Sequence, residues 1–390
     1  MAVSVTVATA ALAANVDAPV QAPASVRRSE VRRDLPLTKF YNTPDPFPAG
    51  KPGALIRSQT IEQYDIPYSV SAVRILYHSR SASGEDVAAS GVVLLPYDKK
   101  PPAGGWPVIA WAHGFAGVAR RCAPSLIRNI GHGPFLAMYV NLGYAVVAAD
   151  YTGLGTSFRN AFLDGPSNAT DVIASIPAAR AAVPRLAAKW IAMGEAEGGL
   201  TVVAVAEKEN EVRDPDYLGG IVLSDIAGVK EIYEPVAAGS SSLMLTSLAY
   251  GIKTVYPQFQ VSDILTEKAL ALYHEIGETC AQATLPELPS RETVKPGWES
   301  NGFVRQYFGR NDPGQTKAYG PILVISGNAD PSKLAAATQA IARMCKQGDP
   351  VQWERYPDLD PGSVIGESVR DQIGWMEGRF GGRSSPTNCP

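Results

Sequence analysis

The segment WIAMGEAEGGL, residues 190–200, combines three local patterns in a short space. Its apolar residues 190–193 predict a buried strand, and residues 200–207 favour a helix. The glycines between them predict a tight turn, because a side chain at either flanking position would collide with the strand or the helix. We therefore expect a strand, a turn and a helix, with Ala196 at the tip of the turn in a strained backbone conformation.

Short apolar runs recur along the chain, separated by segments long enough for a helix. They are residues 106–112, 144–149, 190–193, 220–223 and 321–325. Continuous apolar runs are typical of strands that are buried on both faces, and hence of a parallel sheet. Residues 73–77 and 88–95 alternate or are rich in β-branched side chains, which predicts an opening antiparallel pair. The sequence thus predicts an α/β fold with a mostly parallel sheet flanked by helices.

The strand pattern lapses for about a hundred residues between the runs that begin at Gly220 and Pro321. Residues 229–254 and 264–276 have helical spacing, and residues 285–296 are rich in proline and resemble a loop. A structureless insertion of this length is improbable in a compact domain. We expect a helical cap at residues 229–304, inserted into a core made of residues 36–228 and 305–390.

Residues 1–35 do not fit the strand and helix pattern. Residues 1–14 are apolar and small and end in Ala11-Leu-Ala13, like a signal peptide, although a basic start is missing. Residues 15–35 resemble a polar linker. No apolar stretch approaches the roughly 20 residues that a membrane-spanning helix needs. We expect a secreted or periplasmic protein without integral membrane association.

Charge and cysteine content exclude several classes of function. Lys and Arg number 35 and Asp and Glu number 38, with no long run of one sign, so nucleic acid is a poor candidate partner. The chain has four cysteines without a CxxC pattern, which argues against a zinc site and leaves no metal to expect. An even number of cysteines in an exported chain instead suggests two disulfides.

Residues 190–200 also have the spacing of the G-x-S-x-G nucleophile elbow of serine hydrolases, with Ala196 in place of the serine. In such enzymes an acid and then a histidine follow along the chain. Asp330 follows a predicted strand and fits the acid position, but Pro361 stands where the histidine is expected. All the histidines of the chain precede Asp330: His78, His113, His132 and His274. No histidine is therefore available downstream of the acid.

Several other motifs occur in order within residues 55–389. They are Ala112-His-Gly114, Cys122-Ala-Pro-Ser125, Gly143-Tyr-Ala-Val-Val147, Asp150-Tyr-Thr-Gly-Leu-Gly155, Lys295-Pro-Gly-Trp298 and Trp375-Met-Glu-Gly-Arg-Phe-Gly381. Together with the elbow they make the sequence resemble the secretory lipases, which are α/β hydrolases related to yeast lipase A. The resemblance implies an α/β-hydrolase fold, a helical cap over an acyl pocket, two disulfides, and hydrolysis of carboxylic esters without a cofactor.

The resemblance also implies roles for individual residues. Ala196, Asp330 and Pro361 fall on the nucleophile, acid and base positions of the family, so the catalytic triad is incomplete. The two disulfides are expected to join Cys122 to Cys280, on the side of the oxyanion loop, and Cys345 to Cys389, at the C-terminus.

The backbone donors of an oxyanion hole do not depend on the missing side chains. We expect them to be the N–H of Glu197 and one N–H from Gly114 or Phe115. A pocket with these donors could bind a small hydrophobic ester, a lipid or a carbonyl compound. His113, which precedes Gly114, is expected to brace this loop by hydrogen bonding, and His132 is expected to be an ordinary loop residue.

Three hypotheses for function remain open. The chain is an inactive hydrolase scaffold that binds a ligand; or it is a repurposed catalyst of isomerase or cyclase type that uses Glu195, Glu197 and Asp330 as acid and base; or it is an active lipase or esterase that carries engineered inactivating substitutions. Structural roles compete with the second hypothesis, since Glu195 could form a hydrogen bond under the loop and Glu197 could point to solvent.

Overall fold

The computed structural model describes residues 35–224, 226–238, 242–278, 280, 287–327, 329 and 331–389, without the side chains of residues 234–238 and 332. The predicted signal-like segment lies outside these residues, and so does the predicted linker except for Leu35. Residues 34–390 form one compact unit. Within its described part, no helix is both long enough and apolar enough to cross a lipid bilayer.

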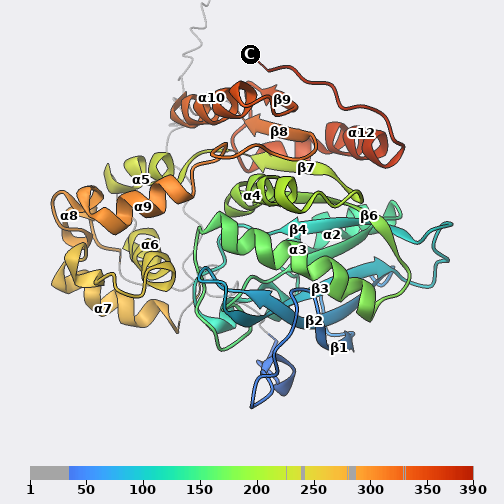
Figure 1. Cartoon of the computed structure of the whole chain (residues 1–390), viewed down its shortest axis with the longest axis horizontal. Coiled ribbons are helices and arrows are strands. Elements are labelled where there is room, and N and C mark those ends of the chain that lie inside the picture. Colours follow the sequence, from blue (N-terminus) through green and yellow to red (C-terminus); the bar gives the residue numbers. More distant parts are fainter. Residues whose placement is uncertain are drawn as a thin grey trace, which may run out of the picture. The chain divides into compact units, whose positions relative to one another are not determined.

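A nine-stranded sheet in the order β1-β2-β3-β5-β4-β6-β7-β8-β9 runs through the described residues (Figure 1). Its strands are β1 (Leu55–Ile61), β2 (Val70–Arg80), β3 (Asp86–Pro96), β4 (Trp106–Ala112), β5 (Ala145–Ala149), β6 (Leu186–Glu195), β7 (Tyr217–Ser224), β8 (Ile322–Gly327) and β9 (Val351–Tyr356). β2 pairs antiparallel with both β1 and β3. The pairs β4–β5, β4–β6, β6–β7, β7–β8 and β8–β9 are parallel. The predicted fold class is confirmed.

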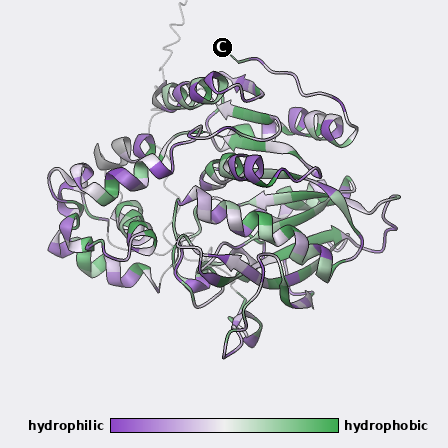
Figure 2. Ribbon diagram, viewed as in Figure 1, coloured by the Kyte–Doolittle hydropathy of each residue, from purple (hydrophilic) through white to green (hydrophobic). Residues whose placement is uncertain are grey.

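Helices cover both faces of this sheet. They are α2 (Gly133–Asn141), α3 (Gly165–Ala182), α4 (Glu197–Val212), α10 (Pro331–Lys346), α11 (Ser363–Glu367) and α12 (Val369–Phe380). Val172 of α3, Val203 of α4 and Ile341 of α10 belong to the apolar cluster on one face. Leu136 of α2 and Met376 of α12 belong to the cluster on the other face. Hydrophobic residues accordingly concentrate along the strands, while the outer surfaces of the helices carry hydrophilic residues (Figure 2).

A helical segment, residues 229–310, follows β7 before the sheet resumes at β8. Its helices are α5 (Val229–Ala238), α6 (Ser242–Val255), α7 (Glu267–Ile276), α8 (Ser290–Thr293) and α9 (Gly302–Arg310). They lie beside the sheet, and α5, α6, α7 and α9 share an apolar cluster that contains Leu245 and Ile252 together with Phe162 and Leu200 (Figure 1). Helix α9 runs across the predicted cap limit at residue 304. Short 3-10 helices complete the chain: η1 (Lys39–Tyr41), η2 (Arg120–Cys122), η3 (Pro124–Leu126), η4 (Val261–Asp263) and η5 (Trp298–Ser300).

Two disulfides join distant parts of the chain. Cys122 is bonded to Cys280, which connects the loop after β4 to the helical segment. Cys345 of α10 is bonded to Cys389, which fixes the C-terminal segment to the core. Both predicted pairings are confirmed.

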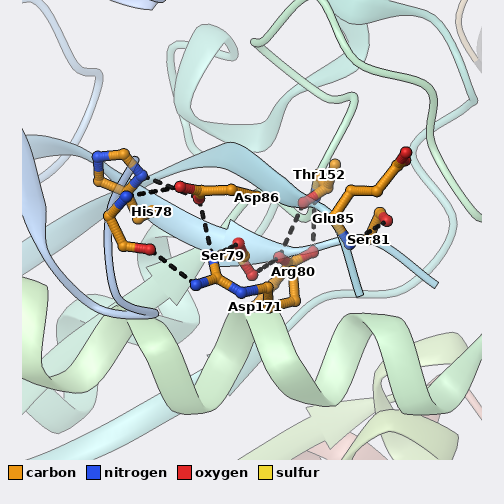
Figure 3. A network of polar contacts seen from close by, with 9 residues as sticks. His78, Ser79, Arg80, Ser81, Glu85, Asp86, Thr152 and Asp171 are labelled. Carbon is orange, nitrogen blue, oxygen red and sulfur yellow. Dashed lines mark hydrogen bonds and ion pairs between the residues drawn. The ribbon is translucent and has the colours of Figure 1, made fainter. Parts of the chain in front are cut away.

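Polar side chains link the two strands of the β2–β3 hairpin to each other and link the hairpin to α3 and to the loop after β5 (Figure 3). Asp171 of α3 accepts hydrogen bonds from the hydroxyl of Ser79 on β2 and from the backbone N–H of Thr152, 2.6 Å away, in the loop after β5. Asp86 of β3 accepts from the guanidinium of Arg80 at 2.8 Å. The contacts of Asp171 therefore hold the loop after β5 against α3 and β2.

Candidate functional site

Ala196 lies at the tip of the turn between β6 and α4, at the carboxyl edge of the sheet. Its backbone has φ 50° and ψ −116°, which is an unfavourable conformation for a residue with a side chain. The methyl group is exposed. The strained tip that the glycine pattern predicted is therefore confirmed, and it presents a side chain without any polar atom.

Two glycines make this turn possible. A Cβ atom on Gly194 would lie 2.4 Å from the carbonyl oxygen of Gly198, and one on Gly198 would lie 1.9 Å from the carbonyl oxygen of Ala112. No side chain fits at either distance, so the close approach of α4 to the end of β4 requires glycine. This contact places the start of α4 directly beside the loop that follows β4.

The Glu195 carboxylate fixes that loop. Its Oε1 atom accepts a hydrogen bond from the backbone N–H of Gly114 at 3.0 Å and lies 3.3 Å from Nε2 of His132. Burial opposes ionisation of Glu195, but the hydrogen bond and charge of His132 and the Gly114 N–H outweigh it and lower the pKa. This is the hydrogen bond under the loop that competed with a catalytic role for Glu195. The Gly114 N–H, one of the expected oxyanion donors, faces this carboxylate.

His132 is a member of the site that sequence reasoning missed. It precedes α2, its side chain is 36% exposed, and its ring lies 5.6 Å from that of Trp111 on β4. The ion pair with Glu195 joins residues far apart in sequence that share no motif. The sequence carries no signal that could have paired them.

Glu197 is buried, so the alternative in which it points to solvent is wrong. Its Oε1 atom accepts hydrogen bonds from the backbone N–H of Leu163 at 2.8 Å and from the side-chain amide of Asn168 at 3.1 Å. The loop before α3 covers the first turn of α4 and turns this side chain inward. Burial raises the pKa of Glu197 to about 7.

The first turn of α4 supplies backbone donors next to Ala196. In an α-helix the first N–H groups have no acceptor within the helix, and here they belong to Glu197 and Gly198. The helix dipole places partial positive charge at the same point. Phe115 packs on Phe162 with ring centroids 4.6 Å apart, where the loop after β4 meets the helical segment.

His113 braces the loop after β4, as expected. Its Nδ1 atom lies 2.6 Å from the carbonyl oxygen of Gly114, its Nε2 atom lies 3.2 Å from that of Asp150, and its ring stacks on Tyr151. Burial lowers the pKa of this imidazole, which favours its neutral form. Both ring nitrogens face backbone oxygens, so His113 is a structural residue.

The base position, Pro361, lies after β9. Asp330 is outside the described residues. Pro361 is half-buried in the turn between β9 and α11. The carbonyl oxygen of Leu359, shortly before it, accepts a hydrogen bond from Ala329 at 3.2 Å. The loop that carries Pro361 therefore lies against the end of β8, and Pro361 brings no ionisable group to it.

No protein-family model matches the sequence, and no curated protein is similar to it in sequence. Solved structures do resemble it. The closed state of Candida antarctica lipase A is 16% identical, with a TM-score of 0.78 over 91% of this chain and 89% of the lipase. The rice cell wall degrading esterase LipA from Xanthomonas oryzae is 19% identical, with a TM-score of 0.70 over 84% of this chain and 98% of the esterase.

A putative hydrolase from Legionella pneumophila is 21% identical, with a TM-score of 0.69 over 83% of this chain and 98% of that one. At these identities the likeness concerns the fold. The chain therefore has the α/β-hydrolase fold that lipases and esterases share, as its motifs predicted.

Proposed function

We propose that this chain is a diverged member of the secretory lipase family that binds a small hydrophobic ester, lipid or carbonyl compound at the elbow without hydrolysing it. The observation that carries the proposal is that Ala196 takes the strained backbone conformation of the elbow but has no oxygen atom in its side chain. Hydrolysis at such a site needs an oxygen nucleophile that an imidazole activates.

No described imidazole replaces the missing base. His113 faces two backbone oxygens, and His132 is paired with Glu195. His78 contacts Asp86 across the β2–β3 hairpin, and His274 is exposed on α7. With Pro361 at the base position, the site lacks both the nucleophile and the group that protonates a leaving alcohol.

Binding of a ligand requires neither the nucleophile nor the base that hydrolysis needs. Ala196 is exposed beside the first turn of α4, whose N–H groups can donate to a carbonyl oxygen. Phe115 contributes an apolar wall on the side of the helical segment. These features favour an uncharged ligand with a carbonyl group and a small apolar part.

We further propose that the protein is exported. Its two disulfides leave no free cysteine among the described residues, and such bonds persist in oxidising compartments.

A second candidate function is non-hydrolytic acid–base catalysis by Glu195 and Glu197, with Asp330. It is favoured by one observation, that the pKa of Glu195 is lowered while burial raises that of Glu197 to about 7. Carboxyl groups with separated pKa values are typical of acid–base pairs. The contacts argue against it, because each carboxylate accepts backbone hydrogen bonds that serve the structure.

Two measurements test the proposal. With p-nitrophenyl butyrate, release of nitrophenol should not exceed that in buffer. Binding of ethyl butyrate, measured by saturation-transfer NMR, should be lost in Ala196→Leu, because the larger side chain fills the space over the elbow. The matched control Ala188→Leu changes an exposed alanine at the opposite end of β6 and should bind normally. Turnover by the unmodified chain, or equal binding by both variants, would contradict the proposal.

A further inference from the structure

Helices α3 and α4 lie side by side on one face of the sheet (Figure 1) and line a groove of about 580 Å³. The walls of this groove come mainly from residues 170–180 of α3, residues 208–212 of α4 and residues 213–215, which lead into β7. Glu209 in this lining lies about 18 Å further along the axis of α4 than Glu197. The groove is therefore separate from the elbow.

Glu209 brings an unsatisfied acceptor to the groove. The residue is almost fully buried, with 1% of its surface exposed. Its Oε2 atom accepts a hydrogen bond from the backbone N–H of Asp214 at 3.2 Å. Its Oε1 atom is buried and receives no hydrogen bond from any of the described residues. Buried polar atoms are almost always hydrogen-bonded, to protein, water or an ion, so this oxygen indicates a partner from outside the chain.

The surroundings of Glu209 do not stabilise its charge. Burial raises the pKa of this carboxyl to about 7, because the N–H of Asp214 offsets the burial only in part. The hydroxyl of Tyr217, on β7, is also buried without a partner among the described residues. Burial raises the pKa of this phenol, and the charge of Glu209 raises it further. Two neighbouring polar groups thus lack partners in the same place.

The cations of the groove lining do not fill this gap. Arg180 donates to two backbone carbonyl oxygens of β6, and Arg213 donates to one near the end of α4. Lys208 precedes Glu209 on α4, so its side chain leaves the helix about 100° away. Among the described residues, none of the three reaches Oε1 of Glu209. A positive charge beside this oxygen must come from a ligand.

Apolar side chains line much of the rest of the groove. They include Ile173 and Pro177 of α3 and Val212 of α4, and Val212 is 67% exposed although it is a large hydrophobic residue. Trp190 of β6 belongs to the same lining, and its Nε1–H donates to Asp214 at 2.9 Å, which fixes the indole ring. An indole ring also attracts a cation. The lining therefore favours a ligand that combines a positive charge with an apolar part.

We propose that this groove binds a small organic ammonium ion, whose N–H groups donate to Oε1 of Glu209 and whose apolar part packs on Ile173, Pro177 and Val212. A single unsatisfied carboxylate oxygen beside an apolar wall suits an ammonium group better than a metal ion, which needs several oxygen ligands. This inference does not depend on what the elbow binds.

Binding of phenethylamine tests the groove. At pH 8 an alkylamine keeps its proton, as lysine does, and Glu209 is ionised because its pKa is about 7. In protein labelled with nitrogen-15 tryptophan, the indole N–H signal of Trp190, identified by its absence in Trp190→Phe, should shift saturably as amine is added. Phenethyl alcohol has nearly the same shape without the charge and should bind about 10-fold more weakly. Absence of a saturable shift, or equal binding of the alcohol, would overturn the proposal.

Matched variants locate the binding. Glu209→Gln keeps the shape of the side chain but removes its charge, and should weaken binding of phenethylamine about 10-fold. Glu207→Gln changes another glutamate of α4, whose pKa burial also raises to about 7 but which lies outside the groove lining, and it should bind normally. Ala196→Leu, at the elbow, should also bind the amine normally.

Val212→Ala makes the test independent of the buried carboxyl. It removes two carbon atoms at an exposed position, so it leaves the core intact, and it should weaken binding of phenethylamine about three-fold. Wild-type affinity in Glu209→Gln, or an equal loss of affinity in Glu207→Gln, would show that the amine binds elsewhere and would contradict the proposal.

Discussion

Position 196 supplies a methyl group at the point where a serine hydrolase carries its reactive oxygen, and this difference can be reversed. We predict that Ala196→Ser alone gives no measurable esterase activity, because triad members act as a unit and removing any of them leaves only about 10³- to 10⁴-fold acceleration over water. The double variant Ala196→Ser with Pro361→His should hydrolyse p-nitrophenyl butyrate measurably, since it restores both the nucleophile and its base.

The single variant Pro361→His is the control for this experiment and should be as inactive as Ala196→Ser. A silent double variant that folds normally would show that the pocket has been remodelled, or that Asp330 does not serve as the acid. Activity in Ala196→Ser alone would show that another group, such as His132, reaches the elbow.

The glycine at position 198 can be tested in the same residue-by-residue way. A Cβ atom there would lie 1.9 Å from the carbonyl oxygen of Ala112. Either β4 or α4 would have to move to make space for it. We predict that Gly198→Ala lowers the free energy of unfolding by about 3 kcal/mol, as overpacking does. Gly374→Ala on α12 meets no atom within 4 Å and should be neutral or stabilising by about 0.5–1 kcal/mol. Urea denaturation of both variants would measure the difference.

Sequence reasoning found the elbow but not its surroundings, for a physical reason. Gly194, Ala196 and Gly198 stand close together in one strand–turn–helix motif, so their spacing alone indicates the turn, although the contact that requires Gly198 comes from Ala112 of β4. The partners of Glu195 and Glu197 come from other strands and loops. Whether a glutamate next to the elbow is buried depends on the loop 161–164, whose position no local pattern specifies.

At the scale of elements, the strands buried on both faces were the predictable ones. β4 begins and ends where its apolar run does, β6 and β7 contain their runs, and β5 and β8 begin one residue after theirs. β1 and β9 were not predicted from the sequence. Most of β1 is exposed or half-buried, and β9 mixes charged and apolar side chains, so neither has a continuous apolar run. Edge position thus explains both omissions.

The Asp171 network makes a prediction about how elements are joined (Figure 3). Replacing Asp171 by alanine leaves the N–H of Thr152 and the hydroxyl of Ser79 without their acceptor in a buried place. We predict that Asp171→Ala lowers the free energy of unfolding by about 2–4 kcal/mol. Asp358→Ala, at an exposed position, is the matched control and should change it by less than about 0.5 kcal/mol. Equal stabilities of the two variants in urea would show that the hairpin is held by packing alone.

For the whole molecule, buried carboxyl groups set an unusual dependence of stability on pH. Burial raises the pKa of Glu197, Glu207 and Glu209 to about 7 each, and that of Asp171 to about 6. Each of these groups binds its proton more tightly in the folded chain than in the unfolded one. Their contribution to the free energy of unfolding is therefore fully present below pH 4 and is lost as the pH rises through 6 and 7. His113, whose pKa burial lowers, acts in the opposite direction, but it is one group against four.

We predict that the protein is more stable at pH 5 than at pH 8, by about 3 kcal/mol after allowance for partial solvent screening, or about 5 °C in Tm. Glu207→Gln should remove part of this slope, because the carboxyl of Glu207 accepts backbone hydrogen bonds from residues such as Gly314 in a largely dry place. Glu211→Gln, at an exposed position of the same helix, should leave the slope unchanged. Thermal unfolding of the three proteins across this pH range measures the slopes directly. A wild type that gains stability from pH 5 to pH 8 would mean that these carboxyl groups are hydrated in the folded protein and do not set its dependence on pH.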